Sequence, residues 1–261
     1  MSNRVVGFDR ELRRKWLDET ARFACAGQSE KEIKLELDAV LEGYLSGSST
    51  TRSAKGKTVT VLTRLWVRHP ESTTIFRDEA MAYFQKYGVN SVILHWGLAM
   101  AAYPFFHDTT ENIGRLLSLQ GSFNATQLQR RMREKYGERE TVYRAANRLV
   151  QSISEWGVIQ ETSAKRTFGA TTPISVDDPS LAIWLLESVL IASGNTSAPF
   201  DTLVKSPSLF PFKLMNLTAT SLNHHPRLQI FRQGVDEDVV MFKTTGRAPG
   251  HQGQGSRGSR S

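Results

Sequence analysis

The sequence predicts a mainly α-helical protein, in which an N-terminal helical bundle is followed by a winged helix-turn-helix and a small α+β C-terminal segment. Two observations predict this class. Apolar residues recur at helical spacing over residues 1–105, and the pattern then changes to three helices and a hairpin over residues 108–170. We therefore expect a helical bundle at 1–107, a winged helix at 108–175, a C-terminal helix and hairpin at 176–243, and a disordered Gly/Ser/Arg tail at 244–261.

Five helices are expected in the N-terminal bundle. Ser29 and Glu32 have the spacing of a capping box, which predicts the start of the second helix. The third segment also alternates as a strand would, but its helical neighbours favour a helix from about Ser53 to Val67. The expected ranges are 10–27, 29–45, 53–67, 73–88 and 90–103.

The next segment reads as three helices and two short strands. Helices are expected over 109–121, 124–137 and 138–157, the second of them capped by Asn124. Two strands, 158–162 and 167–170, flank a basic turn. This order within about 60 residues is typical of a winged helix, a variant of the helix-turn-helix.

The C-terminal segment begins with a helix that Asp178 caps, Pro179 opens and Gly194 ends. Prolines interrupt residues 197–223, which are left unassigned, and residues 227–243 are expected to form a hairpin.

The positive charge of the chain is concentrated in particular segments. The net charge is +7, and residues 1–70 carry 13 Lys and Arg against 9 Asp and Glu. Residues 109–169 carry 10 against 6, whereas residues 71–108 and 170–243 are each acidic by two charges. Such segregation is expected where particular surfaces meet phosphates.

Several classes of protein are disfavoured by the sequence. Cys25 is the only cysteine, so neither an intramolecular disulfide nor a cysteine-based zinc site can form, and a reducing cytoplasm is the expected compartment. The apolar stretch 92–106 is too short for a bilayer span and contains His95, so we expect no membrane insertion and no secretion signal. Histidine spacing suggests no metal ligands, and we expect no cofactor and no enzymatic activity.

The residues Gly56-Lys57-Thr58 resemble the end of a phosphate-binding P-loop. That motif needs a glycine at position 51, where this chain has Thr51, and it needs an apolar strand before it. Neither requirement is met, so no nucleotide site is expected. Arg52, Lys55 and Lys57 would instead offer positive charge to a DNA phosphate, together with the exposed backbone N–H groups of a helix start.

The helix expected at 138–157 is the candidate recognition helix. If it buries Val142, Ala146, Leu149 and Ile153, its opposite face presents groups suited to bases and phosphates. The wing tip and the preceding helix would add positive charge. The expected nucleic-acid-binding residues are Arg130, Arg131, Arg139, Thr141, Tyr143, Arg144, Asn147, Arg148, Gln151, Lys165 and Arg166, together with Arg52, Lys55 and Lys57.

Three stretches, 15–37, 53–70 and 136–159, resemble the BrxA family of bacteriophage-exclusion (BREX) defence systems. They show the general pattern of that family: two opening helices, a Ser/Thr/Lys linker, a helix that ends near a tryptophan, and a winged helix. The resemblance covers roughly residues 10–243 and rests on pattern, without a diagnostic motif. It implies an N-terminal domain like that of the NusB antitermination factor and a non-enzymatic, DNA-binding accessory role beside larger defence enzymes.

We therefore expect a cytoplasmic protein that binds double-stranded DNA chiefly through phosphates, as a monomer or weak oligomer, with other defence subunits as further partners. A winged-helix transcriptional regulator would need a dimer and a palindromic site. A docking scaffold would use the same winged helix to bind another protein. Both alternatives remain open at the level of sequence.

Overall fold

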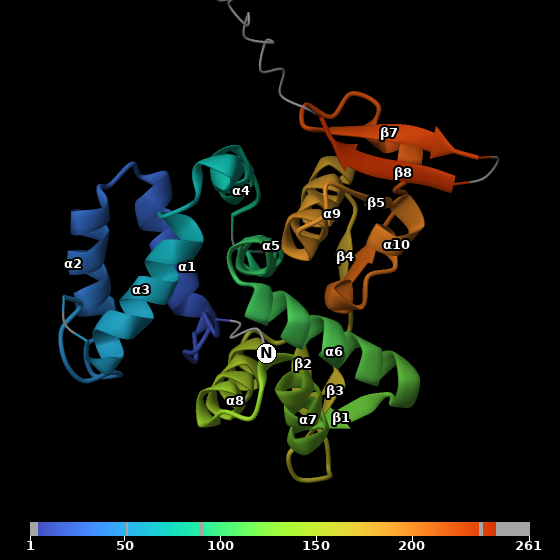
Figure 1. The fold of residues 1–261 in the computed structure, drawn as a ribbon. Helices are drawn as coiled ribbons and strands as arrows, with labels where there is room; N and C mark the ends of the chain where they lie inside the picture. Colours follow the sequence, from blue (N-terminus) through green and yellow to red (C-terminus); the bar gives the residue numbers. More distant parts are fainter. Residues whose placement is uncertain (1–4, 51, 89–90, 235–236, 244–261) are drawn as a thin grey trace, which may run out of the picture.

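The computed structural model describes residues 5–50, 52–88, 91–234 and 237–243, and these residues are mostly helical (Figure 1). The sheets are small and lie mainly in the C-terminal half. This confirms the predicted class at the level of a mainly α protein with a small sheet-containing C-terminal part. The tail expected to be disordered, 244–261, lies outside the described residues. None of the described helices combines the length and hydrophobicity that crossing a bilayer requires.

Four of the five helices expected in the N-terminal half lie side by side, at the left of Figure 1. They are α1 (Arg14–Cys25), α2 (Glu30–Val40), α3 (Ala54–Trp66) and α4 (Thr74–Tyr87), with a short 3-10 turn at Glu71–Thr73 before α4. The capping box at the start of α2 is confirmed, because Ser29 and Glu32 bond each other's backbone N–H groups. The segment that also alternates in the manner of a strand forms the helix α3, and the Ser53 hydroxyl caps it.

The fifth helix, α5 (Val92–Ala102), lies in the middle of the molecule and packs against α9 (Pro179–Ser193). Gly97 permits this close approach, because a Cβ atom there would lie 2.4 Å from the Trp184 ring. Trp184 also stacks on Phe76 with ring centroids 4.5 Å apart. The N-terminal and C-terminal halves therefore share one hydrophobic core.

Three helices and three strands follow α5 and occupy the lower part of Figure 1. The helices are α6 (Pro104–Gln120), α7 (Ala125–Tyr136) and α8 (Glu140–Glu155), and the strands are β1 (Ser122–Asn124), β2 (Ile159–Glu161) and β3 (Thr167–Ala170). The strands form an antiparallel sheet in the order β1-β3-β2. We call residues 104–170 the 104–170 unit.

The 104–170 unit differs from the expected one at its start. Pro104 opens α6, so this helix begins five residues before the expected 109, and the boundary expected at 107/108 falls inside it. Proline suits the first helical position because its missing N–H would have no partner there. The strand β1 was not expected, whereas the Asn124 cap, with Gln127 completing a capping box, is confirmed.

The C-terminal segment combines α9 with short strands. The Asp178 cap, Pro179 and Gly194 have their expected roles in α9, and the expected hairpin is formed by β7 (Leu228–Gln233) and β8 (Glu237–Phe242). The unassigned residues contain β5 (Ser197–Pro199), α10 (Phe200–Val204) and β6 (Phe212–Leu214), with 3-10 turns at Pro207–Leu209 and Ala219–Leu222. β5 pairs with β8, and β6 pairs in parallel with β4 (Ile174–Val176).

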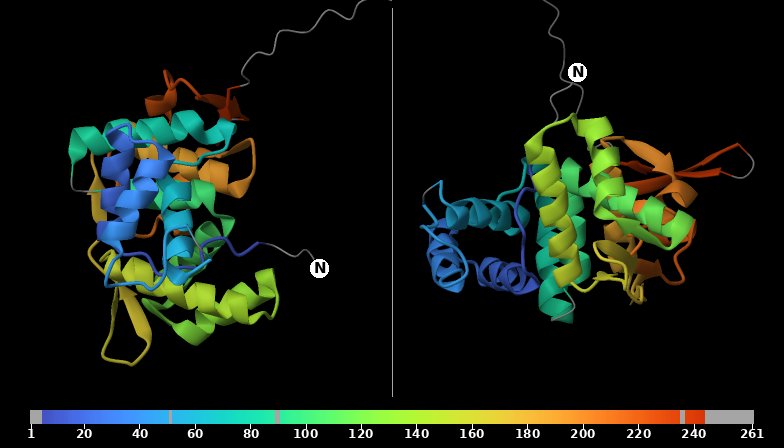
Figure 2. Two further views of the ribbon diagram at one scale, coloured as in Figure 1. Left: turned by 90° about the vertical axis from the view of Figure 1, so that its left-hand side faces the viewer. Right: turned by 90° about the horizontal axis from the view of Figure 1, so that it is seen from below.

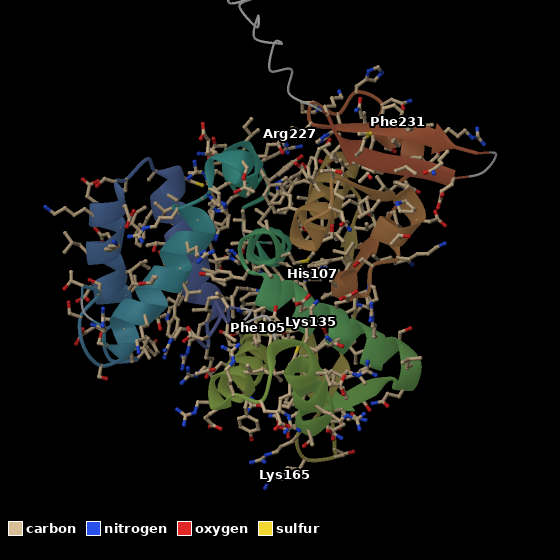
Figure 3. The ribbon with its side chains drawn as sticks, viewed as in Figure 1. Phe105, His107, Lys135, Lys165, Arg227 and Phe231 are labelled. Atoms are coloured by element: carbon tan, nitrogen blue, oxygen red, sulfur yellow. The ribbon has the colours of Figure 1, made fainter. Side chains whose placement is uncertain are left out.

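An ion-pair cluster of the buried Glu187 with the partly buried Arg227 and Glu79 joins the C-terminal segment to the bundle. The Arg227 guanidinium, labelled in Figure 3, lies within 2.5–2.8 Å of carboxylate oxygens of Glu79 on α4 and Glu187 on α9. Burial raises the pKa of Glu187, while the hydrogen bonds from Arg227 oppose that rise. The cluster therefore fixes α4, α9 and the start of the β7–β8 hairpin relative to one another.

Residues 8–14, which we call the N-terminal strap, are bound to α8 through their backbone. Phe8 and Leu12 are fully buried. The Leu12 N–H donates to Ser152 Oγ at 2.9 Å, and the Leu12 carbonyl accepts a bond of 2.8 Å from Trp156 Nε1. Two further bonds join Arg148 to the Asp9 carbonyl at 2.7 Å and the Arg14 N–H to Glu155 Oε2 at 2.6 Å. One side of α8 is therefore covered by the start of the chain.

Candidate functional site

A hollow of about 770 Å³ lies between α7, α8 and the turn that joins β2 to β3. The left-hand view of Figure 2 shows that turn extending away from the helices. Most of the side chains that line the hollow are polar or basic. They are Asn124, Thr126, Gln127, Gln129, Arg130, Tyr143, Asn147, Gln151, Lys165, Arg166 and Thr167, with Ala125, Val150 and Phe168 as the apolar part.

One face of α8 forms a wall of the hollow. Tyr143, Asn147 and Gln151 follow one another at intervals of four residues, so they lie on the same side of the helix. Tyr143 is 41% exposed. The opposite face is the predicted core face, because Val142, Ala146, Leu149 and Ile153 are all fully buried.

Three cationic side chains surround the hollow. Arg130 lies on α7, and Lys165 and Arg166 lie in the turn between β2 and β3. All three are exposed, and none forms an ion pair with an acidic group among the described residues. Figure 3 shows Lys165 at the outer end of the turn. Their charge is therefore available to an anionic ligand.

The turn is held in place by backbone contacts. Arg166 has a φ of 58°, in the left-handed region, which is uncommon for a residue other than glycine. Its N–H donates to Glu161 Oε1 at 2.5 Å, and its carbonyl accepts a bond of 3.3 Å from the N–H of Ala125, the first residue of α7. The first bond connects the turn to β2 and the second connects it to α7, so the backbone that carries the three cations is held beside the hollow.

The remaining residues expected on α8 and α7 do not line the hollow. Arg148 was expected to face nucleic acid, but its guanidinium binds the Asp9 carbonyl of the N-terminal strap, so that expectation is corrected. Arg144 is exposed and pairs with Glu140 at 2.9 Å, one turn away. Arg139 binds the Tyr136 carbonyl at 3.1 Å. Thr141 is exposed and Arg131 is partly buried, and both lie outside the residues that line the hollow.

The start of α3 also differs from expectation. Lys55 is 1% exposed, and its ammonium lies 2.5 Å from Glu42 Oε2 and 3.6 Å from Asp38 Oδ2. The hydrogen bond that the Lys55 ammonium donates to Glu42 raises the pKa of Lys55. The charge of Lys55 is therefore paired with two carboxylates of the bundle and is not available to a phosphate, whereas Arg52 and Lys57 are exposed as expected.

Three consecutive backbone N–H groups at the start of α3 already have acceptors. The Lys55 N–H donates to the Ser46 carbonyl, the Gly56 N–H to Ser53 Oγ, and the Lys57 N–H to the Ser53 carbonyl, at 3.1–3.3 Å. The expectation that these donors would bind a phosphate is therefore wrong. The residues that resemble a P-loop form the start of a helix that a serine caps.

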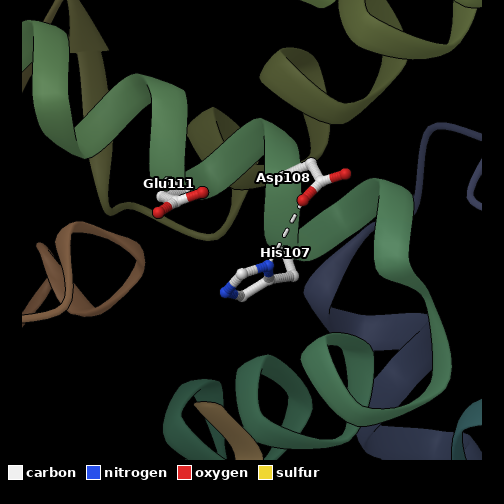
Figure 4. A group of neighbouring side chains, drawn as sticks. All are labelled: His107, Asp108 and Glu111. Atoms are coloured by element: carbon white, nitrogen blue, oxygen red, sulfur yellow. Dashed lines mark ion pairs between the residues drawn. The ribbon is translucent and has the colours of Figure 1, made fainter. Parts of the chain in front are cut away.

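A second cluster was missed by sequence reasoning. His107, Asp108 and Glu111 place potential ligand atoms within 4.8 Å of one another on α6 (Figure 4). Both carboxylates already have cationic partners, because Lys135 lies 2.6 Å from Asp108 and Arg115 lies 2.7 Å from Glu111. Hydrogen bonds from His107, Lys135 and Tyr136 outweigh burial and hold the pKa of Asp108 at about 2. The cluster is thus a charge-compensated part of the α6–α7 contact.

The hollow also contains residues that the sequence did not single out. Gln129 is 8% exposed and donates from Nε2 to Asn147 Oδ1 at 2.7 Å. No local sequence signal identifies this glutamine, because its hydrogen-bond partner is 18 residues away. The structure therefore brings together six of the expected residues, Arg130, Tyr143, Asn147, Gln151, Lys165 and Arg166, and adds Gln129.

No family model, curated protein or solved structure matches the chain.

Proposed function

We propose that the 104–170 unit is a winged helix that binds duplex DNA, mainly through backbone phosphates. In this assignment α8 is the recognition helix and the β2–β3 turn is the wing. The order of three helices and a three-stranded antiparallel sheet supports the assignment. The observation that carries it is the hollow itself, where Arg130, Lys165 and Arg166 have no acidic partner among the described residues and surround the polar face of α8.

The charge pattern of the unit favours nucleic acid over a protein partner. Protein interfaces are usually depleted in charge at their centre, whereas the polar part of the wall of the hollow includes amides, one tyrosine and three cations without acidic partners among the described residues. Lysine and arginine side chains bind phosphates, and amide side chains can reach base edges. A protein-docking scaffold would be supported instead by a partner that stays bound at high salt without DNA.

A binding titration tests this function. Fluorescence anisotropy with a labelled duplex should show affinity that falls steeply with salt, because each phosphate contact releases condensed counterions. Lys165→Glu should weaken binding strongly. The matched control is Lys205→Glu, which makes the same change in net charge at an exposed position on the C-terminal segment, paired with Asp201. Equal losses in both variants, or affinity independent of salt, would refute the proposal.

We also propose that the protein serves as a non-enzymatic accessory factor of a phage-defence system of the BREX type, with a NusB-like bundle formed by α1–α5. The support is the sequence pattern described above together with the five-helix arrangement. Deleting the gene should reduce the protection of a host strain against phage in a plaque assay, and Lys165→Glu should reduce it as well. Full protection in the deletion strain would contradict this role.

A further inference from the structure

Two amide side chains meet at the wall of the hollow. Asn147 lies on the side of α8 that faces the hollow, and Gln129 reaches it from α7 through the 2.7 Å bond between Gln129 Nε2 and Asn147 Oδ1. Gln129 is 8% exposed, so packing restricts its rotamers. Asn147 therefore has a fixed orientation before any ligand arrives, unlike a side chain that is free in solvent.

Asn147 keeps hydrogen-bonding capacity after this contact. An asparagine amide has two donor hydrogens and two acceptor lone pairs, and the bond to Gln129 uses only one of these four. If both amide groups were rotated by 180°, so that Asn147 became the donor and Gln129 the acceptor, the bond would use one Asn147 donor instead of one acceptor. In either orientation Asn147 retains at least one donor and one acceptor, and neither of its polar atoms is among the buried atoms that lack a partner.

A donor beside an acceptor is complementary to one base in the major groove. Adenine presents the N7 acceptor beside the N6 donor, so an asparagine amide can form two parallel bonds with it. Guanine presents two acceptors, N7 and O6, and the amide oxygen would face one of them. Thymine offers an acceptor and a methyl group, and cytosine offers a donor alone.

We propose that Asn147 reads an adenine in the bound duplex and that Gln129 positions it for this contact. The inference rests on the proposed function and adds sequence selectivity to it. The surrounding cations fix the register, because Arg130 on α7 and Lys165 and Arg166 on the turn bind phosphates on either side of the amide pair. Tyr143 and Gln151 lie one turn before and one turn after Asn147 on the same face.

Selection from a duplex library with a randomised segment tests the assignment. The wild-type protein should enrich adenine at one position, and duplexes that differ only there should bind about 5- to 150-fold more weakly with another base. Asn147→Ala should abolish that preference and leave the salt dependence unchanged, because it removes no charge. The matched control is Asn223→Ala, at an exposed asparagine in the C-terminal segment, which should keep the preference.

The role of Gln129 has its own readout. Gln129→Met keeps a similar volume but cannot bond Asn147, so it should reduce the adenine preference without altering the salt dependence. Gln129→Glu cannot donate to Asn147 Oδ1 and can only accept from the Asn147 amide nitrogen. That contact exchanges the positions of the Asn147 donor and acceptor, so this variant should not restore the preference. Thermal denaturation of each variant separates these effects from misfolding. A full preference in Gln129→Met would remove Gln129 from the assignment.

The outcomes separate the two proposals. Salt-dependent duplex binding without preference for any base overturns the adenine assignment and leaves the proposed function in place. An adenine preference that persists in Asn147→Ala also overturns the assignment. If the wild-type protein binds no duplex at any salt concentration, the proposed function fails and the inference fails with it. Selection of single strands over duplexes would likewise refute both.

Discussion

Replacing Ser152 by alanine would remove one hydrogen bond between the N-terminal strap and α8. Ser152 is fully buried, and its Oγ accepts a bond of 2.9 Å from the Leu12 N–H and donates one of 2.8 Å to the Arg148 carbonyl. The Arg148 carbonyl lies inside α8 and keeps its helical partner when the hydroxyl is removed. The Leu12 N–H loses its acceptor, and Leu12 itself is fully buried.

The expected cost follows from that single unsatisfied donor. A buried N–H without a partner costs about 1–3 kcal/mol, and alanine returns roughly 0.5 kcal/mol through its better helix propensity. We therefore expect Ser152→Ala to lower the free energy of unfolding by roughly 0.5–2.5 kcal/mol. Urea denaturation measures this as a lower midpoint, and the slope should stay unchanged because the native surface is nearly the same.

Ser154 provides a matched control on the same helix. It is partly buried, and its side chain makes no hydrogen bond within the described part of the chain. Ser154→Ala changes helix propensity by the same amount, so the difference between the two variants isolates the bond to the strap. If both variants unfold at the same urea concentration, the strap contributes nothing measurable and this reasoning is wrong.

Three further predictions concern binding, pH and packing. If three cations contact phosphates, the affinity of the wild-type protein for duplex DNA should fall about 40-fold between 50 and 200 mM salt. In Lys165→Ala the fall should be only about 12-fold, and in Lys205→Ala it should equal that of the wild type. Anisotropy titrations measure all three. Burial, together with the charge of Arg227, lowers the pKa of His225 to about 4. As the pH falls below about 6.5, the imidazole of His225 is protonated in the unfolded chain before it is protonated in the folded one, so the free energy of unfolding decreases. At pH 5 the decrease should be at most about 1–2 kcal/mol, and it should be smaller in His225→Asn. An equal decrease in both proteins in urea denaturation would contradict this. Gly114→Ala would place a Cβ atom 1.9 Å from the Pro207 carbonyl oxygen, so thermal denaturation should show a loss of about 1–3 kcal/mol, and an unchanged midpoint would argue against that contact.

Much of the helical architecture could be predicted because its signals are local. Ser29, Asn124 and Asp178 are caps whose bonding partners lie two or three residues ahead. The core face of α8 also followed from spacing alone. The strands β1, β4, β5 and β6 have three residues each and depend on partners far along the chain, so no local periodicity identifies them.

The candidate site was predictable only where the exposed face of a helix decided the outcome. Tyr143, Asn147 and Gln151 lie where helical spacing placed them. In the sequence Lys55 and Arg148 look equally suited to a phosphate. In the structure Lys55 pairs with the Glu42 carboxylate and Arg148 donates a hydrogen bond to the Asp9 carbonyl. The spacing along one helix does not reveal such contacts with distant segments. These contacts decide which cations can bind a ligand and which ones only stabilise the fold.

The strap also constrains the order in which the chain can fold. Its bonds to α8 join residues separated by 139 to 144 positions. During synthesis the helices of the N-terminal bundle leave the ribosome long before α8 exists, so residues 8–14 have to wait without their backbone partners. Phe8 can already pack on Tyr103 and Phe106, but the backbone of Leu12 has its partners only when a helix from the middle of the sequence has formed.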